Sequence, residues 1–169
     1  MNSDATTAAL VGALIGSFSM GIVNYVLDTG RRCIRTKSLC LGLAAELETI
    51  WGQHTRNCGT ALMQVAEGAH FTGYYPIGGD YFVNYHANAS DLGELRSTEL
   101  RANIVATYSE LKGLIDSFQL YNELLMGRLG TQNALTTREY TEKLKRMNAH
   151  LDEAIPRLVT DLKNAAEIP

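Results

Sequence analysis

The residues whose types and spacing are suited to chemistry lie near the C-terminal end of the chain. Arg146 and His150 are four residues apart, so a helix would place them on one face. Together with Lys145 they would be able to bind a phosphate and move a proton. Glu142 and Glu153 flank them in the sequence. A solvated helix face is therefore the simpler interpretation of this cluster.

The pair Arg146 and His150 resembles the signature of HEPN ribonucleases, which are helical bundles with an Arg, a gap of four to six residues and then a His on a late helix. The resemblance implies RNA cleavage, with Arg146 and His150 as the candidate catalytic residues. The chain departs from the signature because three residues separate the pair and Met147 replaces the usual polar residue. Lys145 restores the gap but is not Arg. These departures favour a degenerate HEPN-like domain without enzymatic activity.

Other catalytic and metal-binding patterns are missing from the sequence. It contains no Walker loop, no GxSxG and no HExxH. The cysteines form no CxxC pair and the histidines are scattered, so we expect no metal site and no cofactor. These residues are Cys33, Cys40, Cys58, His54, His70, His86 and His150.

Residues 68–90 interrupt the helical pattern with several glycines and Pro76, which predicts a loop or a small hairpin. In one interpretation the aromatic rings of this segment plug one end of a helical bundle. In the other they form a binding surface, because rings on a loop can stack on the bases of a nucleotide. The candidate ligand or partner surface consists of Tyr74, Tyr75, Tyr81, Phe82, Tyr85 and His86.

The element that would position the whole chain is an apolar stretch, residues 5–27, which contains no charged side chain. As a helix with a rise of about 1.5 Å per residue it would reach roughly 34 Å, enough to cross a hydrocarbon layer of about 30 Å. A basic collar follows the stretch, and such a collar stays in the cytoplasm. Its residues are Arg31, Arg32, Arg35 and Lys37.

We therefore predict a transmembrane helix at residues 1–28 and a cytoplasmic helical domain at residues 29–169. The protein would be a single-pass protein of a bacterial inner membrane with its N-terminus outside. A buried helix of a soluble protein is the main alternative, because the stretch contains Thr, Ser and Asn. A signal peptide is disfavoured because the basic residues follow the apolar run instead of preceding it.

Small residues recur at four-residue spacing within the stretch, and this spacing lets two helix backbones approach closely. Asn24 lies near the same face, and an amide in hydrocarbon needs a partner or water. This favours an oligomer seam or a wet lumen, although Asn24 would also be able to reach the lipid headgroups. The predicted oligomer or pore seam is Gly12, Gly16, Ser17, Gly21 and Asn24.

The rest of the chain predicts an all-α fold, in which the transmembrane helix is followed by a cytoplasmic bundle of three or four antiparallel helices. The first helix would continue to about Gln53, with Ile34 and Leu41 in its apolar pattern and Glu46 and Glu48 on its outer face. A second helix has an apolar stripe that packs against other helices. The stripe is Leu100, Ile104, Tyr108, Leu111, Ile115, Phe118 and Leu125.

Cap residues predict where these helices begin and end. Asp91 with Glu94 resembles a capping box that would begin the second helix, and Ser97 or Thr98 would cap a restart at Glu99. Gly127 and Gly130 would end it. Thr136 with Glu139 predicts a capping box for the last helix, in which Pro156 would cause a bend or an end. The inner face of that helix would be Tyr140, Leu144, Met147, Leu151, Ile155, Leu158 and Leu162.

The charge of the predicted cytoplasmic part is nearly balanced. It contains all 15 Lys and Arg residues and every Asp and Glu of the chain's 18 except Asp4 and Asp28. General nucleic-acid binding requires a strongly basic surface, so we do not expect it here.

Parts of the sequence resemble small bacterial proteins that have one N-terminal membrane helix and a helical cytoplasmic domain. The similar parts are Tyr75-Pro76-Ile77, Leu92-Gly93-Glu94-Leu95 and Ile104-Val105-Ala106-Thr107-Tyr108. The layout also resembles CRISPR-associated membrane accessory and effector proteins. That resemblance implies self-assembly, membrane permeabilisation and antiviral defence, with an RNA-guided effector complex or a cyclic nucleotide as a partner.

The sequence thus favours a non-enzymatic, membrane-anchored homo-oligomer that perturbs or permeabilises the membrane in antiviral defence. Its expected partners are membrane lipid and further copies of the chain. One alternative is a membrane-tethered sensor that binds a nucleotide or another ligand with the aromatic segment. The other is a ribonuclease of the HEPN type that uses Arg146 and His150.

Overall fold

The computed structural model describes residues 3–75, 78–79, 81–127 and 134–167, without the side chains of residues 3–19, 134 and 135. Within these ranges the chain has five α-helices and no strand, which confirms the all-α class. The helices are α1 (Ser3–His54), α2 (Thr60–Met63), α3 (Val83–Ala87), α4 (Thr98–Leu125) and α5 (Ala134–Glu167), with a π-helical turn η1 (Thr55–Gly59) and a 3-10 turn η2 (Ala89–Glu94).

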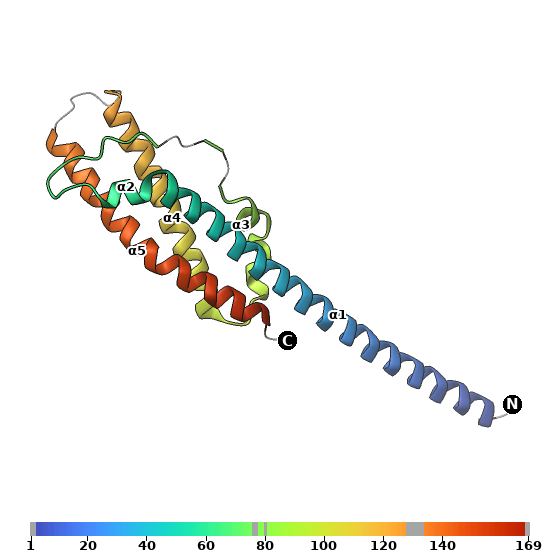
Figure 1. Ribbon diagram of the computed structural model, residues 1–169. Helices are drawn as coiled ribbons and strands as arrows, with labels where there is room; N and C mark the ends of the chain where they lie inside the picture. The colour runs from blue at the N-terminus through green and yellow to red at the C-terminus, as the bar shows by residue number, and fades with distance from the viewer. Residues whose placement is uncertain (1–2, 76–77, 80, 128–133, 168–169) are drawn as a thin grey trace.

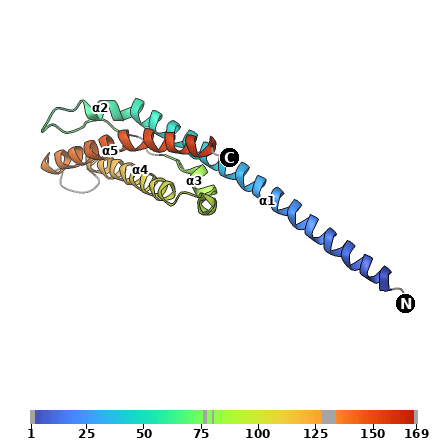
Figure 2. The same cartoon turned by 90° about the horizontal axis from the view of Figure 1, so that it is seen from below.

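The second half of α1 packs with α4 and α5 into a bundle, and the first half of α1 projects from it as a continuous helix (Figures 1 and 2). The predicted continuation of the first helix to about Gln53 is confirmed. In both views α5 runs opposite to α1 and α4, whereas α1 and α4 run in the same direction. The two pairs of long helices that make the main contacts, α1 with α5 and α4 with α5, are therefore antiparallel, as predicted. Residues 64–97 return the chain along the bundle before α4 begins.

The core is formed by the apolar faces of the three long helices and by buried side chains of the segment between α1 and α4, such as Phe71, Tyr75 and Leu95. On α4 and α5 the predicted stripes are confirmed, with Ile115, Leu125, Tyr140 and Met147 only partly buried. On α1 the buried face begins at Leu39. Members of the core include Leu43, Leu47, Ile104, Leu111, Leu114, Phe118, Leu144, Leu151, Ile155, Leu158 and Leu162.

Two expectations for α1 were wrong. Ile34 and Leu41 do not join the core, because their side chains are 72% and 44% exposed. Glu46 is buried instead of facing outward. Helical spacing groups residues onto one face, but it does not say how far along the helix, or on which side, another segment covers that face.

The helix ends follow the sequence at α4 and depart from it at α5. The Leu100 backbone N–H donates to Ser97 Oγ at 3.1 Å, and Gly127 has a φ of 69°, so the start capped by Ser97 and the end at Gly127 are confirmed. The earlier start at Asp91 was wrong, because Ala89–Glu94 forms the 3-10 turn η2. Gly130 lies outside the described residues. Thr136 lies inside α5, which begins at Ala134, so the predicted capping box does not begin the helix. Pro156 does not end α5 either, because the helix continues to Glu167.

The returning segment is attached to the bundle by side chains that satisfy its backbone. The Asn122 amide donates to Tyr75 O at 2.6 Å and accepts from Tyr75 N at 3.3 Å. Thr141 Oγ1 accepts from Phe71 N at 3.0 Å, and the Tyr121 hydroxyl donates to Phe71 O. Buried backbone groups need such partners, so α4 and α5 determine the path of this loop.

Glu46 binds the next part of the segment to α1. Its carboxylate accepts the backbone N–H groups of Asn84 at 2.6 Å and Tyr85 at 3.2 Å, at the N-terminal end of α3. It also accepts the Tyr108 hydroxyl of α4 at 2.8 Å. One carboxylate therefore joins α1, α3 and α4, and its charge favours the positive end of the short helix.

Replacing Glu46 with Ala should lower the free energy of unfolding by about 2–3 kcal/mol, because two N–H groups and a buried hydroxyl lose their acceptor. Urea unfolding of the purified chain, followed by the fluorescence of its single tryptophan, Trp51, measures the change. Glu48→Ala is the matched control, since Glu48 is exposed and makes a surface ion pair with Lys163 at 2.7 Å. That control should change stability by about 0.5 kcal/mol or less. An equal decrease in the free energy of unfolding for Glu46→Ala and Glu48→Ala would contradict the role given to Glu46.

Candidate functional site

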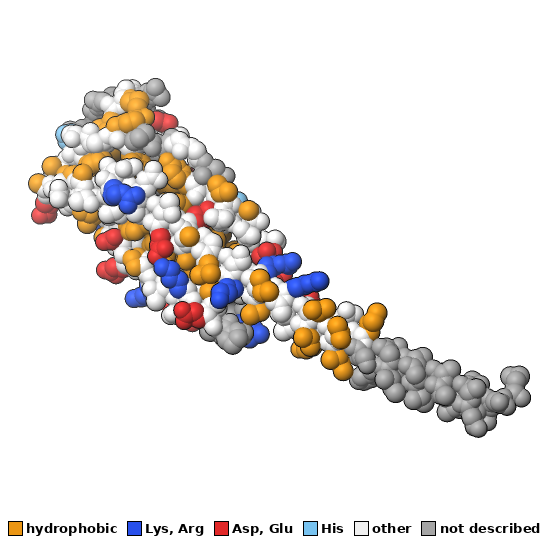
Figure 3. Space-filling model, turned by 45° about the vertical axis from the view of Figure 1, so that its right-hand side comes forward, with side chains coloured by type: hydrophobic (Ala, Val, Ile, Leu, Met, Phe, Trp, Pro, Cys, Tyr) orange, Lys and Arg blue, Asp and Glu red, His pale blue; other side chains and the backbone are white. Residues whose placement is uncertain are grey.

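The projecting part of α1 exposes large apolar side chains that contact none of the bundle helices. Met20, Ile22, Val23, Tyr25, Val26 and Leu27 are all between 52% and 74% exposed. Figure 3 shows hydrophobic side chains gathered on this segment, with Lys and Arg side chains between it and the bundle. A contiguous apolar surface of this kind is uncommon on a soluble monomer and marks an interaction site.

The predicted seam is only partly within the described residues. Gly21 and Asn24 are exposed on α1. Gly12, Gly16 and Ser17 lie outside the residues whose side chains are described. In the described part of the chain, no helix is both long and apolar enough to cross a membrane. Most of the apolar stretch at residues 5–27 belongs to the positions whose side chains are not described.

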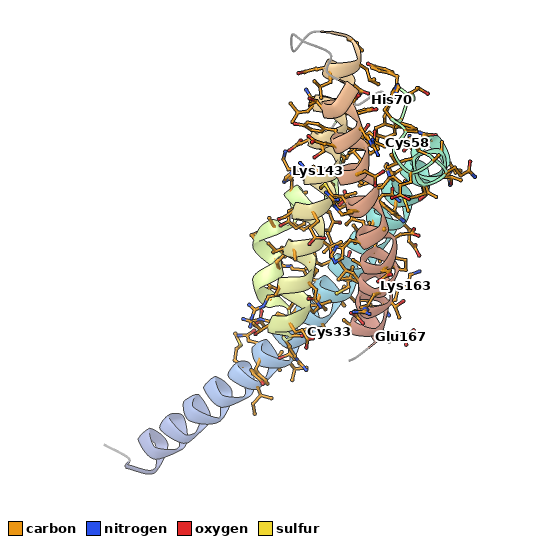
Figure 4. The ribbon with its side chains drawn as sticks, turned by 90° about the vertical axis from the view of Figure 1, so that its left-hand side faces the viewer. Cys33, Cys58, His70, Lys143, Lys163 and Glu167 are labelled. Carbon is orange, nitrogen blue, oxygen red and sulfur yellow. The ribbon has the colours of Figure 1, made fainter. Side chains whose placement is uncertain are left out.

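The basic collar lies where α1 enters the bundle. Arg32 pairs with Asp28 one turn earlier at 3.0 Å, and Arg35 pairs with Glu94 of η2 at 3.3 Å. Figure 4 places Cys33 at this end of the bundle, together with Lys163 and Glu167 of α5. Cys58 and His70 lie at the opposite end. The collar therefore separates the projecting apolar segment from the bundle.

The aromatic segment is mostly turned into the protein. Tyr75 and Phe82 are buried, Tyr81 and Tyr85 are half-buried, and Tyr74 and His86 are exposed. The Tyr85 ring stacks on Tyr108 with ring centroids 4.2 Å apart. Residues 76, 77 and 80, the centre of the hairpin alternative, lie outside the described residues. This arrangement favours the interpretation in which the rings fill the bundle.

Arg146 and His150 are exposed on α5. His150 Nδ1 lies 2.8 Å from Glu110 Oε2 of α4. Glu110 and His150 line an open hollow of about 180 Å³ between α4 and α5, and Arg146 is not part of its lining. Lys145 points elsewhere and donates to Val65 O at 2.9 Å. The three cationic candidates thus do not converge on one point where a phosphate would sit.

A buried cluster around His54, which the sequence did not single out, has the composition of a catalytic site. His54 Nε2 is 2.7 Å from Asn148 Oδ1, and His54 Nδ1 is 3.6 Å from Cys58 Sγ. The imidazole stacks on Trp51 at a centroid distance of 4.9 Å and meets the edges of Tyr75 and Phe118. With the Asn148 oxygen facing Nε2, the ring satisfies both contacts when Nε2 carries the proton.

The environment keeps both groups of this Cys–His pair neutral. Burial raises the pKa of the Cys58 thiol to about 12, so the thiolate that a nucleophile needs does not form near pH 7. Burial also lowers the pKa of His54, and the hydrogen bond with Asn148 opposes this shift. A Cβ on Gly59 would lie 3.2 Å from Asn148 Oδ1 and 3.3 Å from His54 Nε2. The cluster is therefore a tightly packed junction of α1, η1 and α5.

The i, i+4 spacing of His54 and Cys58 was visible in the sequence, but their burial was not. Trp51 lies one turn before His54 on α1, whereas Asn148 lies on α5 and no local pattern joins it to His54. Among the described residues, no group of three or more His, Cys, Asp and Glu side chains is arranged to hold a metal ion.

Comparison with known proteins gives no match to this chain among family models, curated proteins or solved structures. The resemblances to HEPN ribonucleases and to CRISPR-associated membrane proteins therefore stay predictions from the sequence. The geometry of the chain itself has to carry the functional argument.

The lowered pKa of His54 predicts acid-sensitive stability. The unfolded chain binds the His54 proton at about pH 6.5, its ordinary pKa, whereas the folded chain binds it only at lower pH. The contribution of His54 is thus fully present above pH 6.5 and is lost as the pH falls toward the lowered value. His54→Gln should flatten this decrease in the free energy of unfolding, measured by urea unfolding between pH 7.5 and 5.

The exposed His70 provides the control, because His70→Gln should keep the wild-type profile. An unchanged acid-side slope in the His54→Gln variant would assign the sensitivity to other groups.

Proposed function

We propose that this protein is a non-enzymatic, membrane-anchored homo-oligomer, held in a lipid bilayer by the first half of α1. The observation that carries the proposal is the exposed apolar surface at residues 20–27, on a helix that projects from the bundle. These residues continue the uncharged stretch that begins at residue 5. Burying each large apolar side chain is worth about 1.5–3 kcal/mol, so this surface strongly favours an apolar environment.

The basic residues that follow the apolar segment support one orientation of the protein in the membrane. Arg31, Arg32, Arg35 and Lys37 follow the apolar segment within three turns. Under the positive-inside rule this collar lies at the cytoplasmic surface, which places the bundle of α4, α5 and the second half of α1 in the cytoplasm. The anchor would then have its N-terminus outside.

Assembly of several copies is supported by the small and polar residues of the anchor. Asn24 is exposed and has no bundle residue near it in the described chain. In hydrocarbon its amide is best satisfied by the same residue of another copy or by water in a lumen. Gly12 and Gly16 allow the close backbone approach that such a contact needs. Membrane perturbation in antiviral defence is the role that the resemblance in layout adds to this proposal.

The bundle gives less support to the two alternatives. A sensor would need accessible rings, yet the rings of the aromatic segment that are exposed are mainly Tyr74 and His86. A ribonuclease would need Arg146 and His150 to converge on a phosphate, yet His150 faces Glu110. A scaffold that positions the anchors of several copies fits the packed bundle better.

Removing residues 1–28 should release the protein from membranes. We expect the full-length chain to stay in the membrane pellet after a carbonate wash and the shortened chain to appear in the supernatant. The fluorescence of Trp51, which lies in the retained bundle, reports whether the shortened chain is folded. If the folded full-length chain appeared in the supernatant after the carbonate wash, the proposal that α1 anchors the protein in the membrane would be wrong.

Replacing Gly16 with Leu should shift the detergent-solubilised protein toward the monomer, because the side chain separates two closely packed backbones. Light scattering coupled to size-exclusion chromatography measures the mass. Gly42→Leu is the control on the same helix, since a Cβ there meets no atom within 4 Å and residue 42 lies beyond the collar. A wild-type chain that is strictly monomeric would contradict assembly.

A further inference from the structure

Four large apolar side chains on α1 lie seven residues apart and are all exposed. Met20 is 69% exposed, Leu27 52%, Ile34 72% and Leu41 44%. In a helix with 3.6 residues per turn, residues seven apart lie on nearly the same face. The four residues therefore form one narrow apolar stripe, which we call the heptad stripe.

The spacing of the heptad stripe is that of a helix pairing with another helix. A strict seven-residue repeat drifts by about 20° per repeat on a straight helix, and two helices that wind around each other keep it in contact. From Met20 to Leu41 the stripe covers three heptads and about 32 Å, at a rise of about 1.5 Å per residue. A lipid contact alone imposes no such period.

Lipid does not account for the second half of the heptad stripe. Ile34 and Leu41 come after Arg31 and Arg32, where the collar meets the headgroups. Their side chains therefore lie in water unless protein covers them. The core of their own bundle does not do so, because Leu43 is nine residues, or about half a turn in net rotation, away from Ile34. The stripe faces away from the bundle.

The presence of a glycine beside the stripe, Gly30, is not explained by packing against the described residues of the same chain. Gly30 lies between Leu27 and Ile34, and a Cβ added to it would meet no atom within 4 Å. A glycine in a helix interior costs about 1 kcal/mol relative to alanine. Close approach of a second helix backbone is a physical reason to keep a glycine at this place.

We propose that residues 20–41 of α1 form a parallel, in-register helical seam with the same residues of a second copy. The inference rests on the proposed function, because copies inserted in one membrane with one orientation hold their α1 helices parallel. In register, each stripe residue meets its own equivalent, so one apolar row covers another. The seam extends the contact of the anchors through the collar and onto the outer side of the bundle.

The charges near the stripe are compatible with a second copy. Asp28, Arg32 and Arg35 are away from the stripe and are paired within the chain. Arg31 and Lys37 flank it at the level of the headgroups, where anionic lipid offsets the repulsion between equivalent cations. The face between them carries the apolar stripe, Gly30 and Ser38.

Cysteine cross-linking in native membranes tests the seam. In a Cys33→Ser background, in which only the buried Cys40 and Cys58 remain, we would add one cysteine at Ile34 or Leu41, which are exposed stripe positions, or at Thr29 as the control. Thr29 is exposed on the same helix but is five residues from Ile34, so it lies well off the stripe. Copper phenanthroline then oxidises thiols that are adjacent in two copies.

Ile34→Cys and Leu41→Cys should give a disulfide-linked dimer on non-reducing gels. Thr29→Cys should give at least about fivefold less, because two cysteines whose Cβ vectors point apart cannot be bridged. Equal cross-linking at all three positions would overturn the seam, and so would none at Ile34 and Leu41. Trp51 fluorescence confirms that each variant is folded.

Charge placed on the heptad stripe provides a second test. Ile34→Glu should shift the detergent-solubilised protein toward the monomer. Val83→Glu is the control and should cause no shift, because it places the same charge at an exposed apolar residue (59%) of α3, away from the heptad stripe. A chain that stays in washed membranes and is oligomeric, but is unaffected by Ile34→Glu and not cross-linked at Ile34, would remove the seam and leave the proposed function intact. Loss of membrane retention in the wild type would instead remove the proposed function.

Discussion

The exposed apolar side chains at residues 20–27 of α1 set the constraint on which the rest of the structure depends, because the bundle leaves them uncovered. The helix is continuous from Ser3 to His54, so the projecting part and the part within the bundle are one rigid element. Whatever covers Met20 to Leu27 therefore also determines where the bundle is held. A contiguous apolar surface of this kind marks an interaction site.

The second half of α1 depends on polar contacts as much as on apolar packing. Residues 64–97 have to run along the bundle without a sheet or a long helix to satisfy their backbone. Glu46, Asn122 and Thr141 supply the missing partners, each from a different long helix. The buried His54 is likewise held in place by side chains of the bundle. Its neutral imidazole lies within hydrogen-bond distance of Asn148 and stacks on Trp51.

Several elements could be predicted from local pattern alone. The continuous first helix, the stripes of α4 and α5, the Ser97 cap and the Gly127 end all follow from spacing and backbone preference within a few residues. The parallel direction of α1 and α4, the burial of Glu46 and the start of α5 before Thr136 did not follow. The first two depend on where the returning segment lies, which is set by contacts between residues far apart in the chain.

The sequence by itself determined the helical character, the position of the uncharged stretch and the basic collar, because these are set by neighbouring residues along one helix. Only the tertiary structure decided which apolar residues remain uncovered. Ile34 and Leu41 share the helical pattern of Leu47, yet they stay exposed while Leu47 is buried. Burial is decided by which surfaces of α4 and α5 reach α1, and the exposed remainder is what the chain has available for membrane or partner.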